Sequence, residues 1–138
     1  LCAQQHDDHR FARRRPAVML TFAPRFFGGA SIAIEVSANP VSGYNFGPSS
    51  SGSASSSTGP NTTVEGGNEP FTYAWTHVST QSGPTPNINS TSVANPVWSA
   101  TVSDGVEAIS IWQLVVTDDN GQQDTINVQV TLGWLNTL

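Results

Sequence analysis

Residues 125–132, Thr-Ile-Asn-Val-Gln-Val-Thr-Leu, alternate between polar and apolar side chains and decide the fold class of the chain. An alternation with a period of two places every apolar side chain on one face of an extended strand. Residues 109–117 form a second predicted strand, with Trp112, Leu114 and Val116 on one face, before a turn sequence, Asp-Asp-Asn-Gly, at residues 118–121. An Asn-Gly pair readily adopts the positive φ angles of a tight turn. The sequence therefore predicts an antiparallel hairpin over residues 109–132.

Strands with the same period recur upstream of this hairpin. Aromatic side chains alternate with small polar ones over residues 71–76, and apolar side chains alternate with polar ones over residues 98–103. Further strands are predicted at residues 31–36 and 62–65. Short strands at intervals of about ten residues, separated by turn sequences, are typical of a β-sandwich or a barrel.

The apolar phase of these strands predicts the core. A buried tryptophan contributes roughly 150–250 Å² of contact surface, so the aromatic phase is interpreted as core and not as a sugar-stacking platform. The predicted core residues are Tyr73, Trp75, Trp98, Trp112, Leu114, Val116, Val128 and Val130. Trp134 follows the last predicted strand, so we expect this side chain to be exposed and to contact a partner.

Charge is scarce and unevenly distributed in this 138-residue chain, whose length suits one domain. Charged residues make up 11% of the sequence, against roughly 25% in an ordinary soluble domain. Four of the five basic residues lie in the first 15 positions, and residues 19–138 carry eight acids and one base, a net charge of −7 (1 − 8). A surface of this sign repels phosphate, so nucleic-acid binding is not expected. No apolar run approaches the roughly 18 residues of a membrane span, and no membrane insertion is expected.

The sequence divides into three parts by composition. Residues 1–30 are predicted to form a poorly ordered arm. The only methionine is Met19, so residues 1–18 either precede the true start or form a basic extension. Residues 31–132 are the predicted sandwich, with a Ser/Gly-rich loop at 49–63 that alternatively contains a polar edge strand. Residues 133–138 are predicted to be a C-terminal tail. The single cysteine, Cys2, excludes an internal disulfide.

Two stretches carry a resemblance to a known family. Residues 66–75, Gly-Gly-Asn-Glu-Pro-Phe-Thr-Tyr-Ala-Trp, resemble the opening strand of PKD-like immunoglobulin-fold domains. Residues 111–121 together with 125–132 resemble the closing hairpin of these domains. The Trp-Ser-Ala strand at residue 98 is similar to immunoglobulin-like domains of tailed-phage virion proteins. The resemblance covers about residues 62–132, and more loosely residues 32–132.

Two departures from the family pattern accompany this resemblance. Thr-His-Val-Ser at residues 76–79 replaces the W-x-F-G-D-G segment of PKD repeats, and Leu114 stands where the second immunoglobulin cysteine would lie. The resemblance implies an all-β fold, an immunoglobulin-like (PKD-like) antiparallel β-sandwich of about seven strands without a disulfide.

The function implied by the resemblance is that of a non-catalytic structural or adhesive module. The expected setting is a phage virion surface, as a tail protein or a capsid decoration. The expected partners are other virion proteins or host-surface glycans. An oligomeric arrangement of the chain on the particle is a further expectation. The alternative is a carbohydrate-binding or adhesion domain of a bacterial secreted or cell-surface protein.

Few residues suggest chemistry, and neither an enzyme activity nor a cofactor is predicted. His77 is the only histidine after residue 9 and is expected on the solvent face of its strand; no serine lies in a Gly-x-Ser-x-Gly elbow. Asp118, Asp119 and Asp124 are candidate calcium ligands, because clustered carboxylates suit calcium. The alternative is turn chemistry, since Asp side chains accept local backbone hydrogen bonds.

Overall fold

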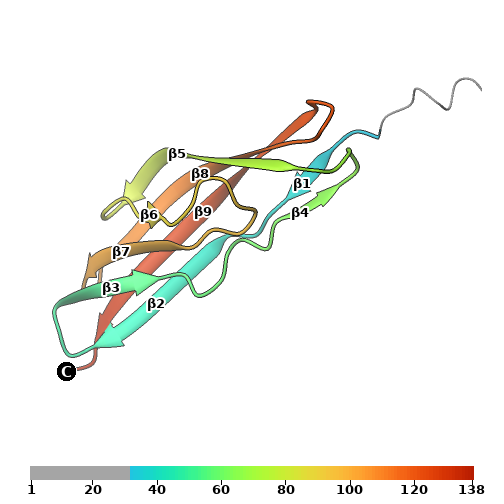
Figure 1. Cartoon of the computed structure of the whole chain (residues 1–138). Helices are drawn as coiled ribbons and strands as arrows, with labels where there is room; N and C mark the ends of the chain where they lie inside the picture. The colour runs from blue at the N-terminus through green and yellow to red at the C-terminus, as the bar shows by residue number, and fades with distance from the viewer. Residues whose placement is uncertain (1–31) are drawn as a thin grey trace, which may run out of the picture. The chain divides into compact units, whose positions relative to one another are not determined.

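A computed structural model describes residues 32–138, which form nine β-strands and no helix (Figure 1). The strands are β1 (Glu35–Ser37), β2 (Val41–Gly47), β3 (Ser51–Ser55), β4 (Thr63–Glu65), β5 (Thr72–Ser82), β6 (Asn87–Ile88), β7 (Trp98–Ser103), β8 (Glu107–Thr117) and β9 (Gln123–Asn136). The predicted all-β fold is confirmed. Within this range no helix is long and apolar enough to cross a membrane. The predicted N-terminal arm, residues 1–30, lies outside the described residues.

The strands form two main layers and one short ribbon. One layer is a four-stranded sheet in the order β2-β9-β8-β5, and the other is a three-stranded sheet in the order β3-β7-β6. Strands β1 and β4 pair separately as an antiparallel ribbon. All pairs are antiparallel except β2 and β9, which run parallel. Strands β3 and β7 pack against β9, so the two sheets enclose the core between them in a sandwich-like arrangement (Figure 1).

Three tryptophans meet between the two sheets. The ring of Trp98, from β7, lies 5.3 Å from that of Trp75 on β5 and 5.9 Å from that of Trp112 on β8, both in edge-to-face geometry. Such pairs add about 0.5–1.5 kcal/mol beyond the area they bury. Trp98 is fully buried, and the other two are nearly so. Leu114, Val116, Val128 and Val130 are also buried here.

Tyr73 differs from the other predicted core residues because it is only half-buried. It packs against the edge of the core near the start of β5. This strand lies at the edge of its sheet, so it pairs with one strand only, β8.

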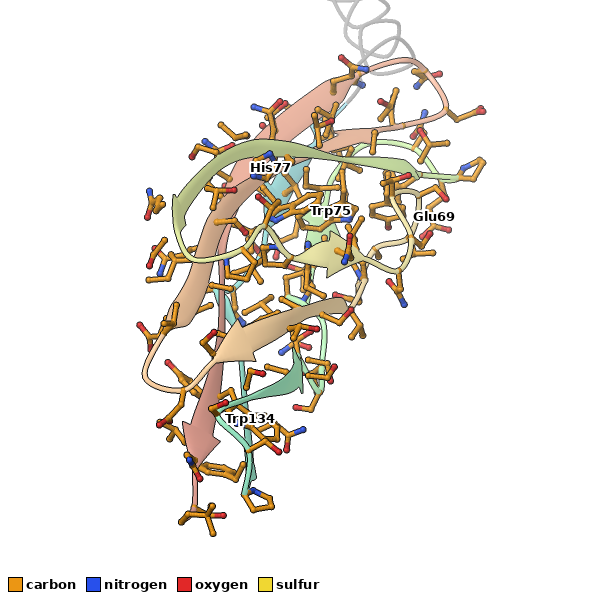
Figure 2. The ribbon with its side chains drawn as sticks, turned by 90° about the vertical axis from the view of Figure 1, so that its left-hand side faces the viewer. Glu69, Trp75, His77 and Trp134 are labelled. Carbon is orange, nitrogen blue, oxygen red and sulfur yellow. The ribbon has the colours of Figure 1, made fainter. Side chains whose placement is uncertain are left out.

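The prediction that Trp134 is exposed beyond the last strand is wrong. Strand β9 continues to Asn136, which removes most of the predicted tail, and Trp134 retains only 9% of its exposure. Its indole Nε1 donates a 2.8 Å hydrogen bond to the carbonyl of Ser49. A Cβ atom added at Gly47 or Gly52 would lie 2.3–2.7 Å from the nearest ring atoms of Trp134. Gly47, the last residue of β2, and Gly52, in β3, thus leave the space that this indole fills; Trp134 is labelled in Figure 2.

The Ser/Gly-rich segment at 49–63 contains strand β3 and the start of β4, so it is not a loop throughout. Five residues of β3 pair with β7, from Ser51–Ser103 to Ser55–Ser99. Ala54 is fully buried on the inner face of β3. The inward residues Gly52 and Ala54 are therefore packing residues, whereas the three serines of β3 are exposed.

Strand β2 lies in residues 41–47, for which the sequence analysis predicted no strand. The strand predicted at 31–36 is confined in the structure to the three residues of β1, and the chain resumes as β2 at Val41. A Cβ atom at Gly43 would lie 2.2 Å from the carbonyl oxygen of Ser55. Strand β2 therefore needs a glycine on its inner face, and this glycine interrupts the apolar alternation that identifies a strand.

Candidate binding site

A concave site of about 470 Å³ lies at the end of the four-stranded sheet near the C-terminus. It lies mainly on the outer face of this sheet, because Gly133 and Leu135 alternate on β9 with the inward side chains of Leu132 and Trp134. The turn between β7 and β8 and the end of β5 form its walls. The lining residues are Tyr44, Ser82, Gly105, Val106, Glu107, Gly133, Trp134 and Leu135.

Three adjacent strands place the central polar pair of this site. Tyr44 on β2 is opposite Gly133 on β9, and Gly133 is in turn opposite Glu107 on β8. A Cβ atom at Gly133 would lie 2.5 Å from two carbons of the Tyr44 ring. Glycine at this position lets the ring cross β9, and the Tyr44 hydroxyl donates a hydrogen bond to Oε1 of Glu107. The ring is thus held against the sheet while 47% of the side chain stays exposed.

Exposed apolar side chains gather around this pair. Phe46 and Leu135 are register partners on β2 and β9, with 59% and 44% of their surface exposed. Val106, in the turn before β8, is exposed and lines the same site. Exposed apolar side chains that stand singly are ordinary, whereas a group of them around a concave site marks an interaction surface.

The electrostatic environment of the site is uniformly acidic. Residues 32–138 contain eight Asp and Glu residues and no Lys or Arg, a net charge of −8. Asp104 lies at the same end, where its Oδ1 accepts a hydrogen bond from the backbone N of Asn136 at 2.8 Å. Glu107 therefore has no cationic partner among the described residues.

The hydrogen bond to Glu107 raises the pKa of the Tyr44 hydroxyl above its ordinary value of about 10. Loss of hydration and the negative charge of Glu107 act in the same direction. Since the pKa in the folded chain exceeds that in the unfolded chain, this bond stabilises the fold fully below about pH 10. Its contribution is lost as the pH rises through the raised pKa.

We expect Glu107→Gln to lower the pH at which Tyr44 ionises, because glutamine accepts the same hydrogen bond without the negative charge. The measurement is an NMR titration of chain labelled at the Cζ carbon of tyrosine, which separates Tyr44 from Tyr73. The matched control is Glu65→Gln on β4, which should leave the Tyr44 titration unchanged. Identical Tyr44 titrations in the wild type and Glu107→Gln would contradict the assignment of the pair.

The three candidate calcium ligands do not gather into a metal site. Oδ1 of Asp118 accepts hydrogen bonds from the backbone N of Asn120 and Gln122, at 3.0 and 2.8 Å. Its Oδ2 accepts one from the backbone N of Asn68 at 2.9 Å. The side chain of Asp118 is buried and joins the β8–β9 turn to the glycine turn before β5. The carboxylate of Asp118 thus serves the turn chemistry that was the alternative interpretation.

Asp119 and Asp124 stand apart from this arrangement. Asp119 is exposed, whereas Oδ2 of Asp124 accepts a 2.8 Å hydrogen bond from the backbone N of Val36 in the middle of β1. Across residues 32–138, no three His, Cys, Asp or Glu side chains are grouped so that they could hold a metal ion.

His77 is exposed, but it does not lie on the solvent face of its strand. It follows Trp75 by two residues and pairs with Trp112 in the sheet, so it shares the face of the core tryptophans. Its ring lies 5.3 Å from that of Trp112 in edge-to-face geometry, and its Nε2 is 3.0 Å from the hydroxyl of Thr80 (Figure 2). His77 thus covers one edge of the tryptophan cluster, and no acid within residues 32–138 is hydrogen-bonded to it.

The residues of the site were missed by the sequence analysis. Tyr44 and Phe46 lie in β2, where the glycines interrupt the apolar alternation by which a strand is recognised. Glu107 precedes the predicted start of its strand, residue 109. One available signal was Gly133-Trp134-Leu135, which continues the alternation of residues 125–132 with a glycine on the outer phase. Glycine within a strand often marks close approach of another group, here the ring of Tyr44.

Comparison with known proteins gives no family for this chain. No protein-family model, no curated protein and no solved structure matches it.

Proposed function

We propose that the chain is a non-catalytic adhesive module of the immunoglobulin-like class. It contacts its partner through the concave site at the end of the four-stranded sheet, where Tyr44 and Leu135 lie. Two features support the class. Two packed sheets of mainly antiparallel strands, ordered β2-β9-β8-β5 and β3-β7-β6, support an immunoglobulin-like sandwich as the class. The resemblance of residues 62–132 to PKD-like domains points the same way.

The observation that carries the proposal is the position of the exposed apolar side chains. Tyr44, Val106 and Leu135 line one concave site and Phe46 pairs with Leu135 beside it, although the interior core is already well filled without them. Their exposure costs solubility and does not serve the packing of the two sheets. A binding surface explains this cost, and a module that only spaces other domains does not.

The setting that we propose for this module is a virion surface, where it contacts other virion proteins or host-surface glycans. This part rests on the resemblance of the Trp-Ser-Ala strand to phage virion domains. Many copies on one particle would turn weak contacts into a useful avidity. Mass spectrometry of intact particles tests it directly, and absence of peptides from residues 71–83 would count against it.

The binding surface is tested by display of the chain in tetrameric form. Cys2 is the only cysteine, so maleimide-biotin attaches at one position outside the described domain, and streptavidin then presents four copies. We expect the double variant Phe46→Ser/Leu135→Ser to lose at least about tenfold of the binding to intact virions, bacterial cells and glycan arrays. The measurement is the amount of labelled tetramer retained on each surface.

The matched control for this test is Val78→Ser/Val93→Ser, which changes two exposed valines away from the site. This control should bind as the wild type does, and circular dichroism should show both variants folded. Equal loss in the two double variants, or no retention of the wild type on any of these surfaces, would contradict the proposed function.

A further inference from the structure

We infer that the concave site binds an arginine side chain on an extended segment of a partner protein. This inference rests on the proposed function, for which it names the chemistry of the partner. It is carried by the Tyr44–Glu107 pair, by the apolar walls beside it and by the one-sided charge of the described domain.

Charge complementarity indicates that the group bound in the site is positively charged. With eight acids and no Lys or Arg in residues 32–138, the domain cannot neutralise Glu107 from within. An anionic ligand would meet the Glu107 carboxylate with no compensating cation among the described residues. A cationic ligand gains from the Glu107 carboxylate and from the net negative charge, which also attracts it before contact.

The arrangement of Tyr44 and Glu107 suits a guanidinium group. Among the described residues only Tyr44 donates a hydrogen bond to the Glu107 carboxylate, and it uses Oε1. Oε2 stays free to accept from a second donor. The outer face of the Tyr44 ring, lying across Gly133, offers a flat surface on which a planar cation stacks. A guanidinium combines this stacking with charged hydrogen bonds to a carboxylate, which an ammonium does less well.

The apolar walls of the site suit the remainder of an arginine side chain. Val106 and Leu135 line the site beside the carboxylate, and both are exposed. The three methylene groups of arginine pack on such surfaces while the charged group reaches a polar partner. The volume of about 470 Å³ falls within the range of sites that hold small organic groups. Neighbouring residues of the partner would then contact Phe46.

The experiment is an NMR titration of the full chain labelled with ¹⁵N. The probe is the blocked peptide Gly-Arg-Gly-Arg-Gly, and its counterpart carries citrulline, a neutral isostere of arginine, at both positions. We expect the arginine peptide to shift the backbone amides of Glu107, Gly133 and Leu135 in a saturable way. The citrulline peptide should bind at least about tenfold more weakly. Raising the salt concentration should weaken binding of the arginine peptide, as for any partly exposed ion pair.

Two matched variants locate the effect. Glu107→Gln should weaken binding of the arginine peptide at least about fivefold, whereas Glu65→Gln, which removes an equal charge on β4, should leave it nearly unchanged. Equal weakening by both variants, or shifts spread over all the acidic residues, would show general attraction to a negative protein and overturn the inference. Equal binding of the citrulline peptide would overturn it too.

Failure of this inference is distinguishable from failure of the proposed function. Binding of neutral oligosaccharides at the same amides, without binding of the arginine peptide, would overturn the arginine assignment and leave an adhesive site for glycans. Unchanged tetramer retention in Phe46→Ser/Leu135→Ser would overturn the proposed function by a separate measurement.

Discussion

Replacing Trp98 by alanine is expected to destabilise the domain by about 3–5 kcal/mol, the usual cost of truncating a large buried aromatic side chain. Trp98 is fully buried and contacts the rings of both Trp75 and Trp112, so its removal leaves a cavity between the two sheets. Total stabilities are typically only 5–15 kcal/mol, and this chain has no internal disulfide to limit the loss. Urea unfolding followed by tryptophan fluorescence measures the change.

Phenylalanine variants keep this prediction testable if the alanine variant does not fold. The indole Nε1 of Trp98 is buried without a hydrogen-bond partner among the described residues, whereas that of Trp75 donates a 2.9 Å bond to the carbonyl of Val93. Trp98→Phe therefore loses no hydrogen bond, and Trp75→Phe loses one worth about 0.5–1.5 kcal/mol. We expect Trp98→Phe to cost no more than Trp75→Phe, although Trp98 is the more buried. A loss below about 1 kcal/mol in Trp98→Ala would contradict the central position of this residue.

Replacing Asp118 by alanine is expected to destabilise the domain by about 2–4 kcal/mol. The substitution removes the acceptor for three backbone N–H groups, those of Asn68, Asn120 and Gln122. Hydrogen bonds to a charged group contribute about 1.5–3 kcal/mol each, and the exposed turn lets water recover part of the loss. Thermal unfolding followed by circular dichroism at neutral pH measures the effect.

The neighbouring Asp119 provides the matched control for this prediction. It has the same charge and lies in the same turn, but its side chain is exposed, so Asp119→Ala should change stability by less than about 0.5 kcal/mol. Asp118→Asn should fall between the two, because the amide keeps one acceptor oxygen and presents a donor where the second stood. Equal losses in Asp118→Ala and Asp119→Ala would show that charge in the turn matters and the specific hydrogen bonds do not.

Much of the sheet structure could be predicted because its strands carry large apolar side chains with a period of two. The alternation around Trp75, Trp98 and Trp112 located the first half of β5, all of β7 and most of the β8–β9 hairpin. These tryptophans do meet between the sheets, as their common phase indicated. Periodicity is informative here because each strand has one face on the core and one on solvent.

Strands β2 and β3 could not be predicted from the sequence because they are rich in glycine and serine. Gly43 and Gly52 lie where the opposite layer comes too close for a side chain, so the strands that contain them carry no apolar alternation. For the same reason Trp134 was wrongly predicted to be exposed. Its burial requires small residues that lie more than 80 positions earlier in the chain. Such complementarity between distant residues cannot be found from the composition of either segment alone.

The candidate site was hidden for a related reason. Its residues come from β2, β9 and the start of β8, and they become neighbours only through the parallel pairing of β2 with β9. A parallel pair gives no local turn signal, in contrast to the Asn-Gly turn that marks the β8–β9 hairpin. Tyr44 and Glu107 are 63 positions apart, and nothing in either local sequence points to the other.

The parallel pairing of β2 with β9 also determines how the domain responds to mechanical tension. Seven register pairs join these strands, from Val41–Val130 to Gly47–Asn136. Strand β1 and the C-terminus lie at opposite ends of the domain (Figure 1). A force that pulls these ends apart therefore acts along the β2–β9 pair and loads its hydrogen bonds in shear. These hydrogen bonds then share the force and do not break one after another. An attachment device under load gains from such a geometry.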